Sequence, residues 1–323
     1  MVSYGPPGSL DRLLASVARQ TVRPSRVRIW HNGPSFPPPP VDGAELFHCR
    51  ENLGFGEGVN RLLEQVEADH ALVANPDLDL DEHCVERLWT ELAGHPRAMV
   101  SAAALASGGA DRRVNAYGQR LTADYLGICP DRGRSWPEFL AQAPDEVANA
   151  PERYLGPSGG LFALNCREWR ARIGGPLFLR SFFLYMEDVA LWIRLRLQGA
   201  EIRFCPTAWA SHAWSASTGQ RSAKKLYHVE RNRLWLLRAL FGTPRAAGLL
   251  PMTALRYAAY LARARSVGPG GSGLAKALQL ALSEGLRGAV PAELSEYFRG
   301  CDASALPRSF FASLREQLAN PVA

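Results

Sequence analysis

The stretch "HALVANPDLDL", from His70 to Leu80, indicates the fold class of this chain. Its first half is an apolar run with the length of a buried strand, and it stops at the turn-forming residues "PDLD". A helical pattern, "VNRLLEQVEA", precedes it. Another helical pattern, "CVERLWTELAGH", and a further strand pattern, "AMVSAAAL", follow it. Strands that alternate with helices predict an α/β fold with a mainly parallel sheet that is covered on both faces.

The same alternation continues toward both ends of the chain. On the N-terminal side we expect a helix over Ser9–Gln20, followed by the strands "RVRIW" and "AELFHC". Residues 106–155 are irregular and read as a variable insertion. After them we expect the strand "SGGLFALN", the helices "REWRARIGG" and "EDVALWIRLRLQG", the strand "EIRFCP" and the loop "TAWASHAWSAST". From Arg221 onward the pattern is helical, with a break at "GPGGSG".

The basic character of the chain is confined to one region. Residues 221–265 hold ten Lys or Arg and a single acid, Glu230, so their net charge of +9 exceeds the +6 of the whole chain. Such a region suits an anionic partner, for example a nucleotide, a nucleic acid or an acidic membrane surface. No recognised nucleic-acid module accompanies it, so we expect no nucleic-acid partner.

Cysteine usage and hydropathy predict a cytoplasmic protein. The six cysteines are scattered without zinc-ligand spacing, which is typical of reduced core thiols. The start, "MVSYGPPGSL", has no apolar core of a signal peptide. No apolar run reaches the length of about 18 residues that a membrane-spanning helix needs.

Three polar segments follow predicted strands, where ligands bind in parallel α/β sheets: "HNGPS", "NLGFGEGVN" and "NPDLD". In the second, Gly54, Gly56 and Gly58 precede a helix and would let backbone N–H groups approach an anion. The spacing is neither GxGxxG nor that of a P-loop, which disfavours both of those sites. A plain loop is the alternative.

Asp77 and Asp79, in "NPDLD", are candidate ligands of a hard divalent cation, which would neutralise a diphosphate. The alternative is a turn, because Asn-Pro-Asp is also good turn chemistry. His212, in "WASHAWSAS", could supply a second, softer ligand, although a lone histidine is more often structural.

Glu187 and Asp188 begin a helix directly after the apolar run "FFLYM". Acids at a helix start are favoured by the helix dipole, so simple capping is one interpretation. However, a solvated helix start does not need such an apolar run, and burying unpaired carboxylates is costly. A role in chemistry is the other interpretation. No Gly-x-Ser-x-Gly elbow or flanked cysteine supports nucleophilic hydrolysis.

Taken together, these segments resemble the inverting family-two glycosyltransferases of the GT-A fold, and among them the rhamnosyltransferase-like enzymes of bacterial surface polysaccharides. The resemblance runs from about Met1 to about Leu237, and the order of the motifs makes it specific. The motifs are "SLDRLLASVARQT", "VRIWHNGPS", "NLGFGEGVN", "VANPDLDL", "GPSGGLFALNCREWRARIGG", "FFLYMEDVALWIRLRLQGAEI", "HAWSAS" and "YHVERNRLWLL".

The resemblance implies one GT-A domain and a C-terminal region. Residues 1–105 would form the half that binds the nucleotide sugar, and residues 106–220 the acceptor-binding half with the Glu-Asp motif. Residues 221–323 would form a basic helical region.

The resemblance also implies roles for the polar motifs. Asp77 would bind a divalent metal, Mn²⁺ or Mg²⁺, with His212 and Asp79 as further ligands. Asp188 would be the general base that takes the proton of the acceptor hydroxyl, and Glu187 would orient it or contact acceptor hydroxyls.

Other positions would bind the two substrates. The resemblance assigns donor binding to Ser3, Tyr4, Gly5, His31, Asn32, Asn52, Gly54, Asn75 and Asp77, and acceptor binding to Gly159, Gly160 and Trp214. Three features depart from the family pattern. The first strand is almost absent, His31 stands where an Asp usually contacts the base, and Ala190 replaces a further Asp.

The implied activity is transfer of a sugar from a dTDP- or UDP-linked donor, with dTDP-L-rhamnose as the specific expectation. The acceptor would be a glycan or a polyprenyl-diphosphate-linked sugar. A homodimer is a further expectation. The helices "RNRLWLLRALF" and "RYAAYLARAR" would either lie at the inner face of the cell membrane or form a helical cap on the catalytic domain. The alternative function is a degenerate GT-A domain that binds nucleotide or glycan without catalysis.

Overall fold

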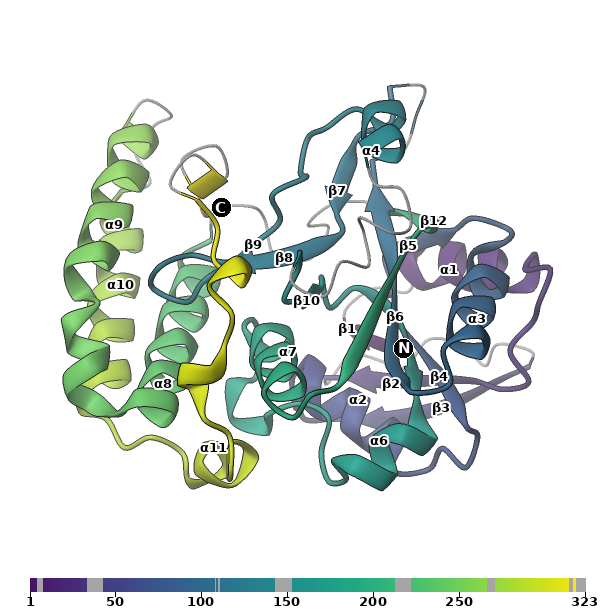
Figure 1. The fold of residues 1–323 in the computed structure, drawn as a ribbon, viewed down its shortest axis with the longest axis horizontal. Coiled ribbons are helices and arrows are strands. Elements are labelled where there is room, and N and C mark those ends of the chain that lie inside the picture. The colour runs from purple at the N-terminus through teal and green to yellow at the C-terminus, as the bar shows by residue number, and fades with distance from the viewer. Residues whose placement is uncertain are drawn as a thin grey trace.

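The computed structural model describes residues 1–4, 8–33, 43–107, 109, 111–142, 153–212, 222–265, 271–313 and 316–317. A body built on β-sheets occupies one side of the molecule, and the long C-terminal helices stand on the other (Figure 1). Gly5 and Trp214, both predicted to bind substrates, lie outside the described residues.

A six-stranded sheet forms the centre of the body. Five strands follow the order β4-β11-β6-β12-β5, and β7 pairs with β6. Their bounds are β4 (His70–Ala74), β5 (Leu78–Leu80), β6 (Ala98–Ala106), β7 (Val114–Ala116), β11 (Leu161–Asn165) and β12 (Glu201–His212). Two three-stranded sheets accompany it. One is fully parallel, with β1 (Val2–Tyr4), β2 (Val27–Asn32) and β3 (Ala44–Cys49), and the other has β8 (Gly118–Leu121), β9 (Gly127–Ile128) and β10 (Gly156–Pro157).

The α/β fold is confirmed, but the central sheet is mixed where the sequence predicted mainly parallel strands. Within it only β6 and β12 pair in parallel, and β11 runs antiparallel to both β4 and β6. A parallel pair needs a long crossover, usually a helix. Strand β11 instead follows β10 of the smaller sheet after the three residues 158–160, and it enters the central sheet antiparallel to its two neighbours.

Helices cover both faces of the central sheet, and each face has its own apolar core. One core includes residues of α1 (Gly8–Ala18) and α3 (Cys84–Gly94). The other includes residues of α2 (Phe55–Leu63), α6 (Cys166–Arg172) and α7 (Glu187–Leu197). The strands feed both cores by alternation: in β11, Leu161 and Ala163 face the first core, and Phe162 and Leu164 face the second.

Helix α7 lies between the sheet and the C-terminal helices (Figure 1). Every residue from Val189 to Leu195 is buried, because the helix packs against protein on all sides. The expected stop at Gly199 is borne out, since the helix ends at Leu197 and Gly199 has a φ of 67°. The remaining short elements are α4 (Trp136–Gln142), α11 (Ala292–Tyr297), η1 (Arg180–Phe182), η2 (Ala303–Ala305) and η3 (Arg308–Phe310).

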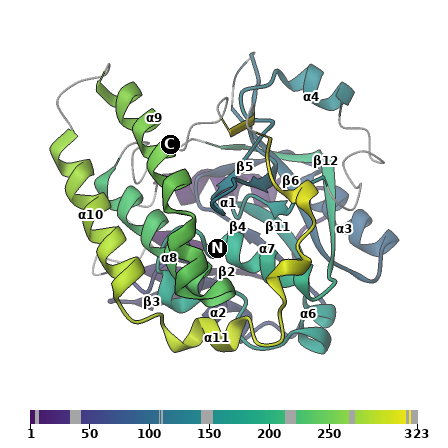
Figure 2. The same ribbon diagram turned by 60° about the vertical axis from the view of Figure 1, so that its left-hand side comes forward.

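Three long helices form the C-terminal region. They are α8 (Ala223–Gly248), α9 (Leu250–Arg265) and α10 (Gly271–Arg287). Helix α8 packs on the body, and α9 and α10 lie on its outer side (Figures 1 and 2). Leu234, Leu236 and Leu237 of "RNRLWLLRALF" are fully buried, so these side chains belong to the protein interior and do not face a membrane. No described helix is both long and apolar enough to cross a bilayer.

Two local predictions are wrong. The segment expected as the loop "TAWASHAWSAST" begins as the second half of β12, which continues to His212 after a register shift between Cys205 and Trp209. Its residues pair with β5 and β6 and bury Ala208 and Ala210, which the turn-like composition did not indicate. The glycine-rich segment "NLGFGEGVN" was expected to precede a helix, but the helix begins within it, at Phe55. Gly56 and Gly58 lie inside α2, where their lack of a side chain lets the helix approach Phe178 and Val2.

Candidate functional site

A strained backbone segment presents the two acids at the start of α7. Phe183, Tyr185 and Met186 have φ angles of 60°, 65° and 68°, in the region that side-chain-bearing residues rarely adopt. The side-chain amide of Asn232, on α8, donates to the carbonyl oxygens of Phe182, Leu184 and Tyr185 at 2.8, 2.9 and 2.8 Å. The C-terminal region therefore fixes the conformation that aims the acids.

Three N–H groups orient the carboxylate of Asp188. The side-chain amide of Gln119, on β8, donates to Oδ2 at 2.8 Å, and the backbone N–H of Gly159 donates to the same oxygen at 3.1 Å. The backbone N–H of Val189 donates to Oδ1 at 2.8 Å. Burial raises the pKa of Asp188, and these donors oppose the rise because they stabilise the charged form.

Glu187 is half-buried beside Asp188, and its Oε2, which is fully buried, accepts no hydrogen bond from the described residues. Burial, and then the negative charge of Asp188, raise the pKa of Glu187 to about 8. No ion pair among the described residues includes either acid. Two adjacent carboxyl groups thus share a site shielded from water, with no ion-pair partner among the described residues, which is an arrangement that accepts and holds protons.

Close approach of the chain at Gly159 brings the sheet up to Asp188. A Cβ on Gly159 would lie 2.9 Å from the Cβ of Asp188, so only glycine fits there. The next residue, Gly160, accepts a hydrogen bond from the N–H of Asn75 at 2.8 Å. The end of β4, with the segment that carries Asp77, is therefore joined directly to the segment beside the acids.

The structure brings Asp77 and His212 together. His212 Nε2 lies 3.2 Å from Asp77 Oδ2, across the 135 residues that separate them in sequence. Asp77 Oδ1 is buried and accepts no hydrogen bond from the described residues. Asp79 is not brought to this pair, because its carboxylate is half-exposed and accepts from Arg19 at 3.0 Å. Within the described ranges no cluster of three or more His, Cys, Asp or Glu could hold a metal ion.

The predicted nucleotide end of the site lies where β1 and β2 stop. Ser3 Oγ and His31 Nδ1 are 2.9 Å apart, and His31 is buried. Tyr4, next to Ser3, has 58% of its side-chain surface exposed. The side chain of Asn32 is buried and donates to the carbonyl of Gly54 at 2.9 Å, so it positions the adjoining loop.

Gly54 links this loop to the segment before the acids. Its φ is 84°, and a Cβ there would lie 2.1 Å from the carbonyl oxygen of Phe183. The N–H of Phe55 donates to the same oxygen at 3.2 Å, and Asn52 Oδ1 accepts from the N–H of Gly54 at 3.0 Å. Asn52 and Gly54 thus shape the wall between the nucleotide end and the acids.

Sequence reasoning missed Gln119 and Asn232. Gln119 lies in residues 106–155, whose irregular pattern predicts a variable insertion, and no local pattern connects Gln119 with Asp188. Asn232 lies inside "YHVERNRLWLL", where an asparagine amid helix-forming residues was the only signal of a side chain with a partner elsewhere. Both contacts join segments that are distant in sequence, so only the folded chain reveals them.

No family model matches the chain. The chain is 29% identical over 246 residues to N-acetylglucosaminyl-diphospho-decaprenol L-rhamnosyltransferase of two Mycobacterium tuberculosis strains, over 70% of this chain and 78% of that protein. Its structure resembles that of GalNAc-T7 with UDP, GalNAc and Mn²⁺ at a TM-score of 0.53 and 12% identity. That match covers 74% of this chain and 47% of the other, so the chain spans about half of that structure.

A mannosyltransferase from Pyrobaculum calidifontis, PcManGT, with GDP-Man and Mn²⁺, gives a TM-score of 0.48 at 13% identity over 88% of this chain and 85% of that one. The fold likeness to GalNAc-T7 and the mycobacterial relative agree with the resemblance that the motifs indicated. They identify the chain as a glycosyltransferase with the GT-A fold, consistent with the family-two enzymes.

Proposed function

We propose that the chain is an inverting sugar transferase in which Asp188 is the general base. The half-buried pair of acids carries this proposal, because three N–H donors orient Asp188 while no ion pair among the described residues includes it. As the acceptor oxygen bonds to the anomeric carbon, its proton passes to Asp188. The bond from that carbon to the diphosphate oxygen breaks on the opposite side, and the nucleoside diphosphate leaves. One such displacement inverts the anomeric configuration.

Glu187 has a complementary role in this proposal. With a pKa of about 8 it keeps its proton at neutral pH, so it can donate a hydrogen bond to an acceptor hydroxyl. A second carboxylate next to Asp188 would instead repel it. Glu187 therefore helps to place the hydroxyl, and Asp188 removes its proton.

The donor we propose is dTDP-L-rhamnose, and the acceptor is an N-acetylglucosamine carried by a polyprenyl diphosphate. The name of the mycobacterial relative supports both assignments. The nucleotide would bind at Ser3, Tyr4 and His31, where Tyr4 offers an exposed ring for stacking on the base. Residues 1–105 would hold the donor, residues 106–220 the acceptor, and residues 221–323 would keep the enzyme close to a membrane surface that carries its lipid-linked substrate.

A divalent cation fits the pair of Asp77 and His212. One carboxylate oxygen of Asp77 is buried without a hydrogen-bond partner, and an oxygen and a nitrogen ligand together suit Mn²⁺. Two protein ligands leave positions for diphosphate oxygens and water. When bound, the ion would offset the negative charge that develops on the departing diphosphate. The chain itself contributes the aimed carboxylate and the buried wall around it.

A transfer assay with purified protein tests the proposal. dTDP-L-rhamnose, UDP-sugars and GDP-mannose are each offered with the lipid-linked acceptor, with Mn²⁺ or with EDTA. We expect transfer from dTDP-L-rhamnose with Mn²⁺, no transfer with EDTA, and a loss of about 100-fold or more in Asp77→Asn. Asp79→Asn, the matched control two residues away, should retain activity because Asp79 is paired with Arg19.

The opposite result would identify a different function. If the protein binds nucleotides equally well with and without EDTA and turns over no donor, it is a degenerate GT-A domain that binds without catalysis. The absence of a third protein ligand among the described residues is the observation that favours this second candidate.

A further inference from the structure

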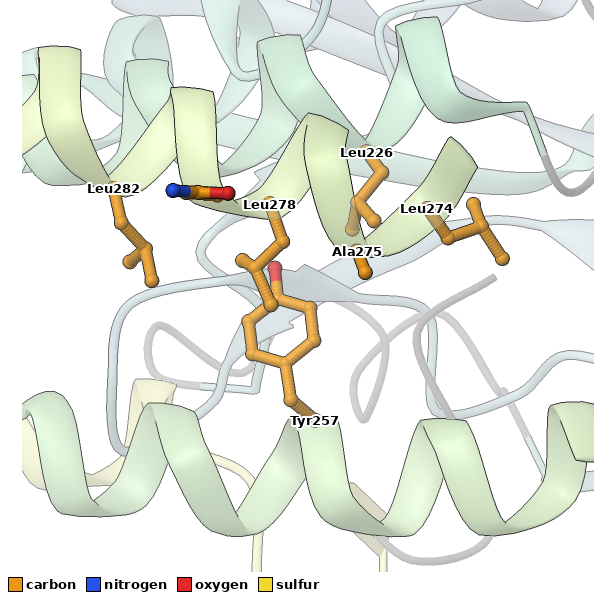
Figure 3. Close-up of a pocket in the computed structure, with 7 residues that line it drawn as sticks. Leu226, Tyr257, Leu274, Ala275, Leu278 and Leu282 are labelled. Atoms are coloured by element: carbon orange, nitrogen blue, oxygen red, sulfur yellow. The ribbon is translucent and has the colours of Figure 1, made fainter. Parts of the chain in front are cut away.

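An almost wholly apolar groove lies among the C-terminal helices, outside the site described above. Its volume is about 250 Å³. Tyr257 reaches into it from α9, and leucines from α10 and α8 face the ring (Figure 3). The six labelled side chains are Leu226, Tyr257, Leu274, Ala275, Leu278 and Leu282, and the polar Gln279 completes the lining.

Leu226, which lines the groove, directly follows two lysines of α8 that lie near the segment before the acids. Lys225 Nζ lies 5.7 Å from the ring centroid of Tyr185, and Lys224 Nζ lies 5.6 Å from that of Phe183. Both rings belong to the strained segment before Glu187. The next residue of α8 is Leu226, which lines the groove, and consecutive helix residues point in directions about 100° apart. The first turn of α8 therefore places ammonium groups at the rings of Phe183 and Tyr185 and an apolar side chain in the groove.

The charges along this path favour an anionic ligand. No carboxylate among the described residues pairs with Lys225, and burial followed by the charge of Arg132 lowers the pKa of its ammonium group. A half-buried ammonium group without an acid beside it is costly, and a diphosphate there would offset that cost. The rings of Tyr185 and Phe183 stabilise the ammonium groups only in part.

We propose that this groove binds the polyprenyl chain of the lipid-linked acceptor. The sugar would lie at Asp188, the diphosphate at Lys224 and Lys225, and the first isoprene units between α9 and α10. The chemical groups of such an acceptor occur in the same order along the molecule: sugar hydroxyls, then two phosphates, then hydrocarbon. The inference rests on the proposed function, because it names the occupant by the acceptor of that reaction.

The experiment compares two acceptors that differ only in the lipid. One carries N-acetylglucosaminyl diphosphate on a long polyprenyl chain in detergent, and the other carries it on a short, water-soluble alkyl chain. Ala275 is exposed and lines the groove, so Ala275→Phe fills it without disturbing the core. We expect this variant to lose about tenfold in kcat/KM for the long chain and nothing for the short one, because a few buried methylene groups are worth that factor.

Two further variants separate the parts of the binding site. Ser283→Phe adds the same ring to an exposed position of α10 outside the groove, and it should leave both acceptors unchanged. Lys225→Met should lower kcat/KM for both acceptors by the same factor, because both contain the diphosphate. If Ala275→Phe keeps the wild-type ratio between long and short chains, the groove does not bind the lipid.

A binding readout keeps the groove testable if the wild type transfers no sugar, which would overturn the proposed function alone. A polyprenyl diphosphate with a benzophenone on its first isoprene units is photolysed with the full chain, and the labelled peptides are identified by mass spectrometry. Labelling of α9 and α10 that Ala275→Phe abolishes supports the inference. Labelling elsewhere, or labelling that survives in this variant, overturns it.

Discussion

Two pairs of acids in this molecule, one buried and one half-buried, have opposite electrostatic surroundings. In the first pair, Asp124 and Glu230, each acid is met by arginines. Arg233 donates to Glu230 Oε2 at 2.7 Å, and Arg256 donates to Glu230 Oε1 at 2.8 Å and to Asp124 Oδ2 at 2.9 Å. Although burial opposes the shift, the charges of the arginines lower the pKa of Asp124 to about 2 and lower that of Glu230 as well. This network joins α8 and α9 to the segment before β9.

The second pair is Glu187 and Asp188. No ion pair among the described residues includes either acid, and burial raises the pKa of both. The same two types of acid therefore serve two purposes in this chain, structural ion pairing and proton transfer. Acids that are paired with arginines have a lowered pKa, stay charged and hold the structure together. Acids that are shielded from water with only N–H donors have a raised pKa and can take the proton of a hydroxyl.

The largest effect should come from Asp188→Asn. The amide keeps the size of the carboxylate but cannot accept a proton, so kcat for sugar transfer should fall by about 10³-fold. The fold should survive, because no ion pair is lost. Steady-state transfer kinetics and a thermal melting curve measure the two quantities. Turnover within a few-fold of wild type would remove Asp188 as the base.

Glu230→Gln should break the other pair by lowering stability. It leaves Arg233 and Arg256 buried with one acid fewer, which should cost about 4 kcal/mol of the free energy of unfolding. Urea denaturation measures the loss. Asp111→Asn is the control, because its ion pair with Arg113 at 3.0 Å is exposed and should change stability by less than about 1 kcal/mol. Equal losses in the two variants would contradict the comparison.

Glu187→Gln should change how stability depends on pH. In the folded protein Glu187 releases its proton near pH 8, whereas in the unfolded chain it does so near its usual pKa of 4.5. Between these values the folded state binds more protons, so this group lowers wild-type stability as pH rises. The variant lacks that slope, so its stability relative to wild type should rise by roughly 3 kcal/mol between pH 5 and pH 8.

Denaturation curves across this pH range measure the gain, and Glu64→Gln, at an exposed position, should show none. Asp124 contributes the opposite slope. Its folded pKa is lowered, so the stability that it provides is lost as pH falls through about 4 to about 2. A Glu187→Gln variant that parallels wild type throughout would show that Glu187 is not held protonated.

The smallest effect should come from Gln119→Met. The variant loses the donor to Asp188 Oδ2, which stabilises the carboxylate, so the pKa of Asp188 should rise. The acidic limb of the pH profile of kcat/KM should move up by about one unit, so activity at pH values on that limb should fall about tenfold. Gln142→Met, at an exposed position, is the control. An unmoved acidic limb would mean that Gln119 only fills space.

Local sequence patterns predicted most of the architecture. The alternation around His70–Leu80 indicated an α/β fold, and the helix beginning at Glu187 and the helical region after Arg221 are present. The pattern did not predict that β11 runs antiparallel to its neighbours or that β12 extends to His212. Strand direction and strand length depend on which neighbour offers free hydrogen-bonding groups, and a single segment carries no information about its neighbours.

For the candidate site, sequence determined which residues are chemically competent, and the tertiary structure decided what surrounds them. The sequence shows four polar residues beside apolar segments: Asp77, His212, Glu187 and Asp188. Each of them also has an ordinary structural interpretation. The fold brought Asp77 to His212 and separated Asp79 from them. It also placed the side-chain amide of Gln119 beside Asp188. A pKa depends on burial and on charges a few ångströms away, and those distances exist only in the folded chain.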